Sequence, residues 1–283
     1  MASNVKVVPT FERSRGNRAP LDMTSDGAML ILFDLDDTLM DDGAAERSAA
    51  THLYNNVETP LSVEEFVSKW SGTLRRHFDR YLAGELSFQG QRRERVREMI
   101  DPSLADEIAD RIFADYHAQY EAGWTLFPDA APCLDGLSGF RLGVITNGQG
   151  DQQRRKLVRT GILDRFECVL ISGECGCSKP DPAIFVRACA SVGELPENSV
   201  YVGDRYDIDA QAARRAGLHG IWLDRKRTAN ASHTPPIVGS LGELLTAIAD
   251  GETLRNHFAH GFRGSSEAQS VARIVKAAGI KPQ

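Results

Sequence analysis

The sequence lacks the long apolar runs of membrane proteins and the positive charge of nucleic-acid-binding proteins. Its 283 residues contain no apolar run near the roughly 20 residues that a membrane helix needs, and the N-terminus has no apolar signal segment. The formal net charge is -6, so there is no basic excess to displace the counterions of a nucleic acid. We therefore expect a cytoplasmic protein that binds neither membranes nor nucleic acids.

Cysteine is scarce as well. The five cysteines are an odd number without the spacing of a disulfide framework, at Cys133, Cys168, Cys175, Cys177 and Cys189. Cys175 and Cys177 flank a single glycine, which suggests a metal or redox site, but no further Cys or His lies nearby to complete a zinc site. We interpret all of them as reduced thiols. The remaining composition, 42% hydrophobic and 25% charged, is that of a globular protein with a substantial core.

Residues 29–39 contain the pattern on which the rest of the interpretation depends. The apolar run 29–33 has the length and composition of a buried strand, and it leads into Asp34, Asp36 and Asp37. Carboxylates at the tip of a buried strand repel one another and lose hydration unless a cation or hydrogen bonds compensate them. The pattern indicates a metal site, with a solvated acidic turn as the alternative.

The segment from residue 43 to 122 follows a helical period instead. One apolar stripe recurs at every fourth residue, at Phe66, Trp70, Leu74 and Phe78, and a second spans residues 108–120. We interpret both stripes as helix core. The segment therefore predicts about four helices, inserted between the first strand and the rest of the fold.

From residue 140 the pattern alternates between strands and helices. We predict strands at 141–145, 168–171, 199–202 and 218–223, and helices at 152–160, 182–192, 208–216 and 241–248. Such alternation is typical of an α/β fold, with parallel strands and right-handed crossovers in a doubly wound sheet. The predicted domains are a core, residues 28–42 and 123–250, and an all-helical insertion, residues 43–122.

The two ends of the chain differ from the core in composition. Residues 1–27 lack periodicity and are predicted to be a disordered leader. Residues 251–283 form an extension in which Ser266 begins a short amphipathic helix. We expect that helix to dock on the core or on a second subunit, and the second arrangement would make the protein a homodimer.

Four polar clusters follow the successive strands of the predicted core. They are Asp34–Thr38, Thr146–Gly148, Ser178–Pro180 and Gly203–Asp209. Each alone has an ordinary explanation as a turn, a surface lysine or a helix cap. The carboxyl ends of parallel strands lie on one edge of a sheet, so we expect the four clusters to converge on one site.

In this order the clusters resemble the motifs of the haloacid dehalogenase (HAD) superfamily, over roughly residues 29–250. The sequence is most similar to the branch with a helical cap between the first and second motifs, in particular its nucleotidase-like and acylneuraminate-phosphatase-like members. The segments that carry this likeness are Ile145–Gly148, Gln153–Leu157, Ser172–Glu174 and Lys179–Pro182. The resemblance implies a Rossmann-like core with a helical cap, and a Mg²⁺-dependent phosphatase that acts through an aspartyl-phosphate.

The residues themselves indicate compatible chemistry. A phosphate monoester is close to a dianion, and each pair of like unit charges about 4 Å apart costs about 4 kcal/mol at an effective dielectric near 20. Attack by an anionic Asp34 therefore requires cations. We predict that Mg²⁺ held by Asp34, Asp204 and the backbone carbonyl of Asp36 supplies two charges, and that Lys179 supplies a third.

The side chains beside the nucleophile also receive predicted roles. Asp36 is predicted to protonate the leaving alcohol and then to activate water. The hydroxyl of Thr146 and the amides of Asn147 and Gly148 are predicted to bind the phosphate oxygens.

Two further residues are expected to support the residues that contact the substrate or the metal, and a third is expected to have no role. Thr38 is expected to support the first motif through local hydrogen bonds, and Asp209 to support the metal or Lys179. Asp37 lies between two functional positions and is expected to face elsewhere.

Substrate choice is assigned to the helical insertion, which is rich in arginine. Arg75, Arg76 and Arg80 are the predicted substrate contacts, because arginine suits bidentate binding of a carboxylate or phosphate. The arginines of segment 92–97 alternate with glutamates, and we interpret them as a solvated helix face. The predicted substrate is a small organic phosphomonoester, and the resemblance favours a nucleoside monophosphate or a sugar phosphate.

Three other activities are considered. A haloacid dehalogenase would share the nucleophile, but the dehalogenase branch lacks an acid at the position of Asp36. A phosphomutase of the β-phosphoglucomutase type retains that acid and is the main alternative. A non-catalytic phosphate-binding protein is disfavoured because the nucleophile, acid, lysine and metal ligands are all present.

Overall fold

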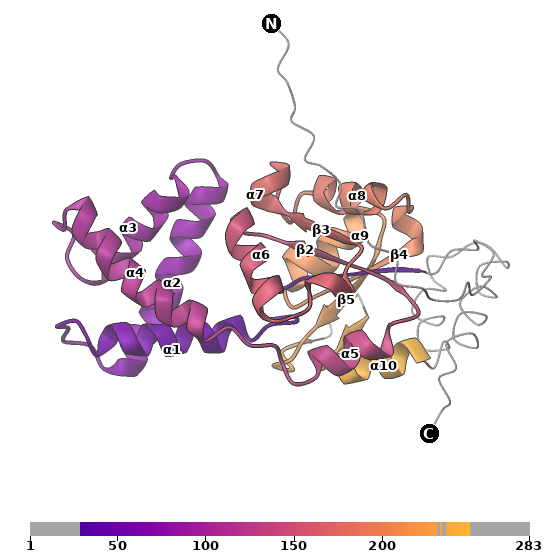
Figure 1. Ribbon diagram of the computed structural model, residues 1–283, viewed down its shortest axis with the longest axis horizontal. Helices are drawn as coiled ribbons and strands as arrows, with labels where there is room; N and C mark the ends of the chain where they lie inside the picture. The colour runs from indigo at the N-terminus through magenta and orange to yellow at the C-terminus, as the bar shows by residue number, and fades with distance from the viewer. Residues whose placement is uncertain (1–28, 231–232, 234–235, 250–283) are drawn as a thin grey trace, which may run out of the picture.

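The computed structural model describes residues 29–230, 233 and 236–249, and its centre is a six-stranded parallel sheet (Figure 1). The predicted leader, 1–27, and the predicted extension, 251–283, lie outside the described residues. The order of the strands is β3-β2-β1-β4-β5-β6. They are β1 (Leu30–Phe33), β2 (Arg141–Thr146), β3 (Cys168–Ile171), β4 (Ser199–Gly203), β5 (His219–Leu223) and β6 (Ile237–Val238).

The central strand β1 is buried on both faces, which explains its continuous apolar run. Ile31 and Phe33 belong to the core on one face of the sheet, whereas Leu30 and Leu32 belong to the core on the other. Alternate side chains of a strand point to opposite faces, so a strand that is covered on both sides needs apolar residues at every position.

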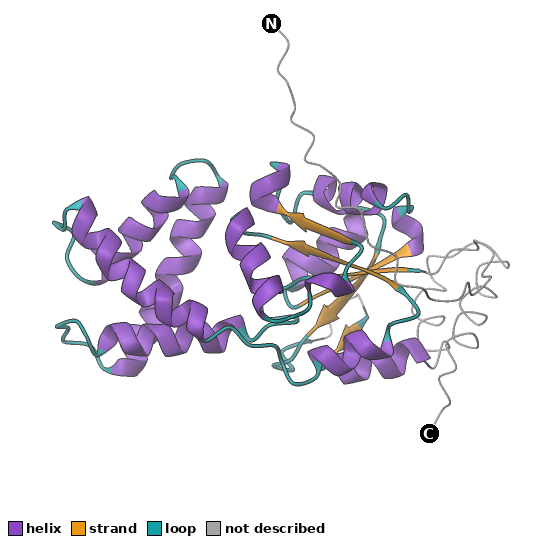
Figure 2. Cartoon of the chain, viewed as in Figure 1, coloured by secondary structure: helices purple, strands orange, loops and turns teal. Residues whose placement is uncertain are grey.

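Helices cover both faces of the sheet (Figure 2). On one face pack α5 (Ala130–Gly136), α6 (Gly150–Arg159) and α10 (Leu241–Ala249), and on the other α8 (Pro182–Ser191) and α9 (Gln211–Arg215). Shorter elements connect them, namely η1 (Leu163–Arg165), α7 (Ser172–Cys175), η2 (Pro196–Asn198) and the π-helical η3 (Tyr206–Ala210). The predicted α/β fold with a doubly wound parallel sheet is confirmed.

Four helices lie between β1 and α5, and we call them the helical insert. They are α1 (Asp42–Tyr54), α2 (Val63–Leu82), α3 (Phe88–Met99) and α4 (Asp106–Ala122). In Figure 1 they stand together at one end of the molecule, beside the sheet and its covering helices. Both α1 and α3 contact α2 and α4, so each helix of the insert packs against at least two others.

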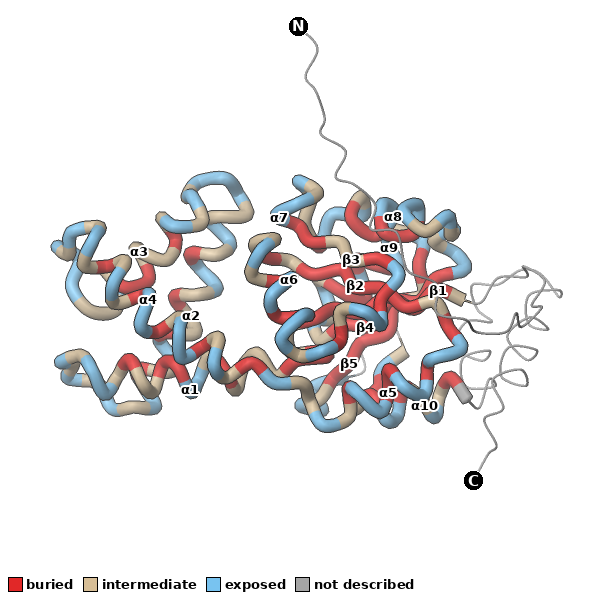
Figure 3. Tube along the Cα trace, in the orientation of Figure 1, coloured by how far each residue is buried: buried red, intermediate tan, exposed pale blue. Residues whose placement is uncertain are grey.

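An aromatic core holds the helical insert together. Trp70 of α2 lies against Phe113 and Tyr116 of α4, and the centroids of the Trp70 and Tyr116 rings are 4.8 Å apart. Phe66 and Trp70 are fully buried, which confirms the first half of the predicted α2 stripe as helix core. Figure 3 shows the buried positions along the chain, and the buried apolar residues of the insert belong to the same cluster as Phe33 of β1.

The predicted strands and helices of the core match the structure to within two residues at each end, except the helix predicted at 208–216, where the π-helical η3 precedes α9 and α9 begins only at Gln211. The start of α8 follows the predicted capping, because the Asp181 side chain accepts a hydrogen bond from Ala183 N–H and Pro182 occupies the first turn. Several elements were not predicted, among them α5, the four-residue α7 and the edge strand β6, which has only two residues. No helix within the described ranges is long and apolar enough to span a membrane.

Candidate active site

The four polar clusters meet at the carboxyl edge of the sheet, at the point where the strand order reverses. The chain passes from β1 outward to β2 and β3, and then crosses to β4 on the other side of β1. Asp34 directly follows β1, Thr146 ends β2 and Asp204 directly follows β4. Ligands of doubly wound sheets bind at such a switch point, so this edge is the candidate active site.

A buried ion pair joins Asp34 and Lys179. The Lys179 Nζ lies 2.6 Å from Asp34 Oδ1, 2.8 Å from Asp209 Oδ1 and 2.9 Å from the Tyr201 hydroxyl oxygen. Asp34 and Lys179 are both buried, although they lie far apart in the sequence. The three contacts fix the ammonium group beside the Asp34 carboxylate.

Asp34, Asp204 and Asp209 form an acidic cluster. One carboxylate oxygen from each of the three lies within 4.8 Å of the other two. Asp209 can approach so closely because residue 203 is a glycine: a Cβ atom at Gly203 would lie 2.5 Å from the Asp209 side chain. The glycine of the fourth predicted cluster is therefore required by packing.

The three carboxylates of the acidic cluster are not equivalent. Asp209 Oδ1 accepts hydrogen bonds from Lys179 and from the Tyr201 hydroxyl, and Asp209 Oδ2 accepts one from the Arg205 amide. Both of its oxygens are therefore engaged by the protein. Asp209 thus contacts Lys179 directly. Asp204 and Asp34 are the two carboxylates better placed to bind a cation.

The acidic cluster carries more negative than positive charge. Burial, and after it the charges of Asp34 and Asp209, raise the pKa of Asp204 to about 9. Burial also raises the pKa of Asp34 to about 7, although Lys179 opposes that shift. Burial alone would lower the pKa of Lys179, but Asp209 and Asp34 raise it above its usual value. A divalent cation would offset this repulsion, and oxygen ligands suit magnesium.

Two side chains of α6 hold Asp36, and neither had a predicted role. Lys156 Nζ donates to Asp36 Oδ1 at 2.6 Å, and Gln153 Nε2 donates to Asp36 Oδ2 at 2.9 Å. The same Gln153 amide group donates to Thr146 Oγ1 at 2.6 Å. Burial, and next Asp42, raise the pKa of Asp36 to about 6, while Lys156 opposes the shift. A carboxyl group with this pKa suits proton transfer near neutral pH.

The sequence contains a signal for the two residues that were missed. Gln153, Lys156 and Leu157 are three and four positions apart, so they share one face of α6, and all three are buried. A lysine and a glutamine in line with a core leucine indicate buried partners. Lys156 has a second one, because its Nζ also donates to Asp42 Oδ1 at 2.8 Å. The series Asp36, Lys156 and Asp42 joins the sheet edge to α1 of the insert.

Asn147 and Gly148 make contacts other than the predicted ones. The Asn147 side chain accepts a hydrogen bond from the Lys179 amide and donates one to the Lys179 carbonyl, both at 2.9 Å. Gly148 N–H donates to Ser172 Oγ at 2.9 Å. The Asn147 side chain therefore fixes the loop that carries Lys179, and the Gly148 amide is already engaged. The Thr146 hydroxyl and the Asn147 amide remain the phosphate-binding predictions of this motif.

Thr38 and Asp37 have structural positions. Thr38 is fully buried, and its hydroxyl has no hydrogen-bond partner among residues 29–230, 233 and 236–249, so it does not give the support that was predicted. The Thr38 carbonyl instead accepts a hydrogen bond from Arg225, which also contacts both carboxylate oxygens of Asp129. Asp37 accepts a hydrogen bond from Gly43 N–H at 2.8 Å and so joins the motif to the start of α1.

Comparison with known proteins identifies the family. The chain matches the model of the haloacid dehalogenase-like hydrolases over residues 28–217. It is a member of this family. It is 36% identical over 209 residues to a glyceraldehyde 3-phosphate phosphatase from Methanopyrus kandleri, a match that covers 69% of this chain and 83% of that protein. It is 32% identical over 255 residues to a phosphoserine phosphatase from Thermus thermophilus, with 78% and 99% covered.

Solved structures agree with this assignment at the level of the fold. A HAD-hydrolase from Bacillus subtilis bound to magnesium has a TM-score of 0.65 and 22% sequence identity, covering 78% of this chain and 98% of that chain. The predicted membership of the HAD superfamily, and with it the prediction of a hydrolase, is confirmed.

The arginines predicted to bind substrate lie on the outer surface of this HAD-like hydrolase. Arg75, Arg76 and Arg80 are exposed on α2, where Arg76 pairs with Glu98 and Arg80 pairs with Glu85. They lie off the buried stripe of α2, although Arg76 reaches Glu98 of the neighbouring α3. None of the three lines the cavity described next.

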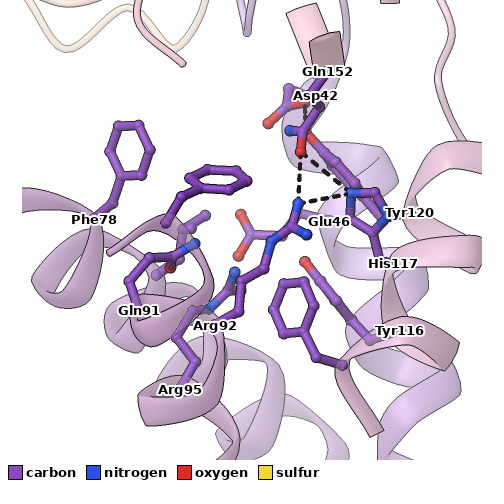
Figure 4. Close-up of a pocket in the computed structure, with 13 residues that line it drawn as sticks. Asp42, Glu46, Phe78, Gln91, Arg92, Arg95, Tyr116, His117, Tyr120 and Gln152 are labelled. Carbon is purple, nitrogen blue, oxygen red and sulfur yellow. Dashed lines mark hydrogen bonds between the residues drawn. The ribbon is translucent and has the colours of Figure 1, made fainter. Parts of the chain in front are cut away.

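A cavity of about 70 Å³ lies inside the helical insert of this HAD-like hydrolase, with walls from α1 to α4 and from α6. Arg92 and Arg95 of α3 line it, and Arg95 is only 3% exposed. The interpretation of these two residues as a solvated helix face is therefore wrong. Figure 4 shows Arg92 reaching toward His117 of α4 and Gln152 of α6, at 3.2 and 3.0 Å.

Proposed function

We propose that this HAD-like hydrolase is a Mg²⁺-dependent phosphatase that hydrolyses a small organic phosphomonoester through an aspartyl-phosphate on Asp34. The main support is the buried Asp34 carboxylate, which has Lys179 Nζ at 2.6 Å and Asp204 beside it. Such a carboxylate can approach a phosphate dianion only where positive charge surrounds it. The two relatives named above are phosphatases, and their named substrates each have three carbons.

The donor set fits magnesium. Mg²⁺ prefers oxygen ligands and is usually held by one or two carboxylates. Asp34 and Asp204 supply two carboxylates, and the backbone carbonyl of Asp36 would supply a third oxygen. When bound, Mg²⁺ supplies positive charge that offsets the repulsion between Asp34 and the phosphate.

The reaction would proceed in two steps. In the first, Asp34 attacks phosphorus, the bond from phosphorus to the leaving oxygen breaks, and Asp36 donates a proton to that oxygen. In the second, Asp36 takes a proton from water, whose oxygen attacks phosphorus and releases inorganic phosphate and the Asp34 carboxylate. Lys156 and Gln153 are positioning residues, because they fix both oxygens of Asp36.

The helical insert is proposed to act as a cap, with residues 43–122 closing over a core of residues 28–42 and 123–250. Arg92 of α3 and His117 of α4 both contact the side chain of Gln152 on α6, at 3.0 and 3.2 Å. Arg155 of α6 also pairs with Glu121 of α4 at 2.8 Å. These contacts are polar, so separation from α6 exposes groups that water can solvate. Reversible closure would admit substrate and then exclude water.

Phosphate release by the full chain from a panel of phosphorylated metabolites tests the proposal. The panel contains nucleoside monophosphates and sugar phosphates, which the family resemblance favours, together with three-carbon phosphoesters. We expect release with Mg²⁺ and none with EDTA. An assay for isomerised sugar phosphate in the same samples separates a phosphatase from a mutase. A folded protein that released phosphate from no compound would contradict the proposal.

Two substitutions test the assigned roles. Asp34→Asn is expected to abolish turnover, because an amide cannot form the aspartyl-phosphate. Asp36→Asn is expected to lower kcat by about 10²- to 10⁴-fold, the usual contribution of general acid and base catalysis. Asp151→Asn, at an exposed carboxylate on α6, is the matched control and should retain activity. Full activity in Asp34→Asn would exclude this mechanism.

A further inference from the structure

Arg95, inside the helical insert, is a buried arginine with an unused edge. It is 3% exposed, and its Nε and Nη2 atoms have no hydrogen-bond partner in the part of the chain that the structure describes. Its guanidinium lies over the rings of Trp70, Phe113 and Tyr116, at 4.6, 5.3 and 5.4 Å from their centroids. The ring faces stabilise the charge but do not satisfy donors that point along that edge. Buried donors without acceptors are costly, so the edge indicates a ligand.

Elsewhere in this chain the same edge of arginine holds carboxylates. In three ion pairs, Nε and Nη2 each donate to a different oxygen of one carboxylate, at distances from 2.6 to 2.9 Å. The pairs are Arg93 with Asp110, Arg141 with Glu167 and Arg154 with Glu174. Side-on contact with a carboxylate is thus the arrangement that the unused donors of Arg95 match.

Two arginines, Arg92 and Arg95, and two carboxylates, Asp42 and Glu46, line the cavity. Of the two carboxylates in its wall, Asp42 is already bound by Lys156 at 2.8 Å. Glu46 then stands against two guanidinium groups, those of Arg92 and Arg95. Burial, and after it the charge of Arg95, lower the pKa of Arg92 to about 10. An anionic group of the ligand would relieve the repulsion between the two arginines.

We infer that this cavity binds a carboxylate group of the substrate, which would therefore be a phosphorylated carboxylic acid. The carboxylate would lie side-on against Arg95. Two acceptor atoms of the cavity, Gln91 Oε1 and Glu46 Oε1, also lack a partner among the described residues, and they suit a hydroxyl or amino group on the same acid. The assignment rests on the proposed phosphatase function, because it concerns the end of the substrate that does not react.

The position and size of the cavity fit such a substrate. Lys156 Nζ lies 2.8 Å from Asp42, in the cavity wall, and 2.6 Å from Asp36, so a single side chain separates the cavity from the proposed acid. A volume of about 70 Å³ exceeds the roughly 10–15 Å³ that one water molecule needs. The cavity therefore has room for a carboxylate and a small substituent beside it.

The experiment compares esters that differ in the carboxylate. The full chain with Mg²⁺ is assayed on 2-phosphoglycolate and 3-phosphoglycerate, and on ethyl phosphate and glycerol 3-phosphate as counterparts without a carboxylate. We expect kcat/KM to be at least tenfold higher for the acids, as a bidentate charged contact implies. Equal values for the two groups would overturn the inference while leaving the phosphatase proposal intact. Release from none of the panel compounds would overturn the phosphatase proposal, and this inference with it.

Substitution of Arg95 locates the effect. Arg95→Met and Arg95→Lys should each reduce the ratio of kcat/KM between the esters with a carboxylate and those without one by tenfold or more, because lysine lacks the paired donors. Arg111→Met, at an exposed arginine on α4, is the matched control and should keep the wild-type ratio. An unchanged ratio in both Arg95 variants would also overturn the inference.

Inhibition of the wild-type protein keeps the inference testable if the Arg95 variants do not fold. Glycerate should inhibit competitively, at a concentration at least tenfold below that needed for glycerol. Equal inhibition by the two compounds would count against a carboxylate site.

Discussion

Replacing Lys156 by methionine removes the cation that joins the sheet edge to the helical insert. The Lys156 side chain is 1% exposed, and its Nζ donates to Asp36 Oδ1 at 2.6 Å and to Asp42 Oδ1 at 2.8 Å. Methionine has a similar length and no charge. The substitution would therefore leave two neighbouring carboxylates without their common partner, and it would release Asp36 from one of its two contacts.

The expected cost follows from burial. Removing one partner of a buried ion pair costs about 3–5 kcal/mol. The side chains of Asp36 and Asp42 are 28% and 16% exposed, so water recovers part of that cost. We expect the free energy of unfolding to fall by about 2–4 kcal/mol and Tm to fall by about 5–15 °C. Because Asp36 loses its position, kcat should also fall, by at least about tenfold.

Urea denaturation followed by circular dichroism would measure the change in stability. Adding Asp42→Asn to Lys156→Met removes one of the two carboxylate charges that lost their partner. The free energy of unfolding of the double variant should therefore be higher than that of Lys156→Met by about 1 kcal/mol or more. Lys69→Met, at an exposed lysine on α2, is the matched control and should stay within about 0.5 kcal/mol of wild type. The reasoning is refuted if Lys156→Met also stays within about 0.5 kcal/mol, or if the double variant is the less stable one.

Three further substitutions test the geometry of the site. Gly203→Ala would place a Cβ atom 2.5 Å from the Asp209 side chain, so it should cost about 1–3 kcal/mol in thermal unfolding and reduce phosphate release; wild-type values would contradict the packing argument. Asp209→Asn removes a charge 2.8 Å from Lys179 Nζ and should lower kcat by about tenfold or more with KM little changed, which steady-state kinetics would show. Arg225→Met leaves Asp129 without its bidentate partner and should lower the free energy of unfolding by about 1–3 kcal/mol, measured in urea; an unchanged midpoint would argue against that contact.

The sheet and its acidic edge could be predicted because both depend on local sequence. An apolar run marks each buried strand, and Asp34 and Asp204 come directly after such runs. The topology of a doubly wound sheet then brings those strand ends together without any further information. The partners of the side chains could not be predicted in the same way. Asn147, for example, binds the Lys179 backbone, which enters the site from a loop distant in sequence.

The residues of the helical insert that line its cavity could not be predicted from the sequence. In α3 the alternation of arginine and glutamate is typical of an exposed helix, yet its buried residues are Gln91, Arg95 and Val96. Arg95 can be buried because aromatic rings of α2 and α4 lie against its guanidinium. Those rings come from other helices, so the sequence of α3 alone does not indicate them. Arg75 and Arg76 looked better suited to bind an anion, but they lie off the buried stripe of α2.

The distribution of charge argues that the sheet edge and the cavity of the insert act on one molecule. The three carboxylates of the acidic cluster outnumber Lys179, so the sheet edge needs a cation. In the cavity of the insert, two donors of Arg95 have no acceptor among the described residues, and an anion would satisfy them. Lys156, which is paired with both Asp36 and Asp42, lies between the acidic cluster and the cavity. Closure over an ester without a carboxylate would leave the buried donors of Arg95 unsatisfied, whereas a phosphorylated acid would satisfy them. Closure itself would therefore favour the carboxylated substrate.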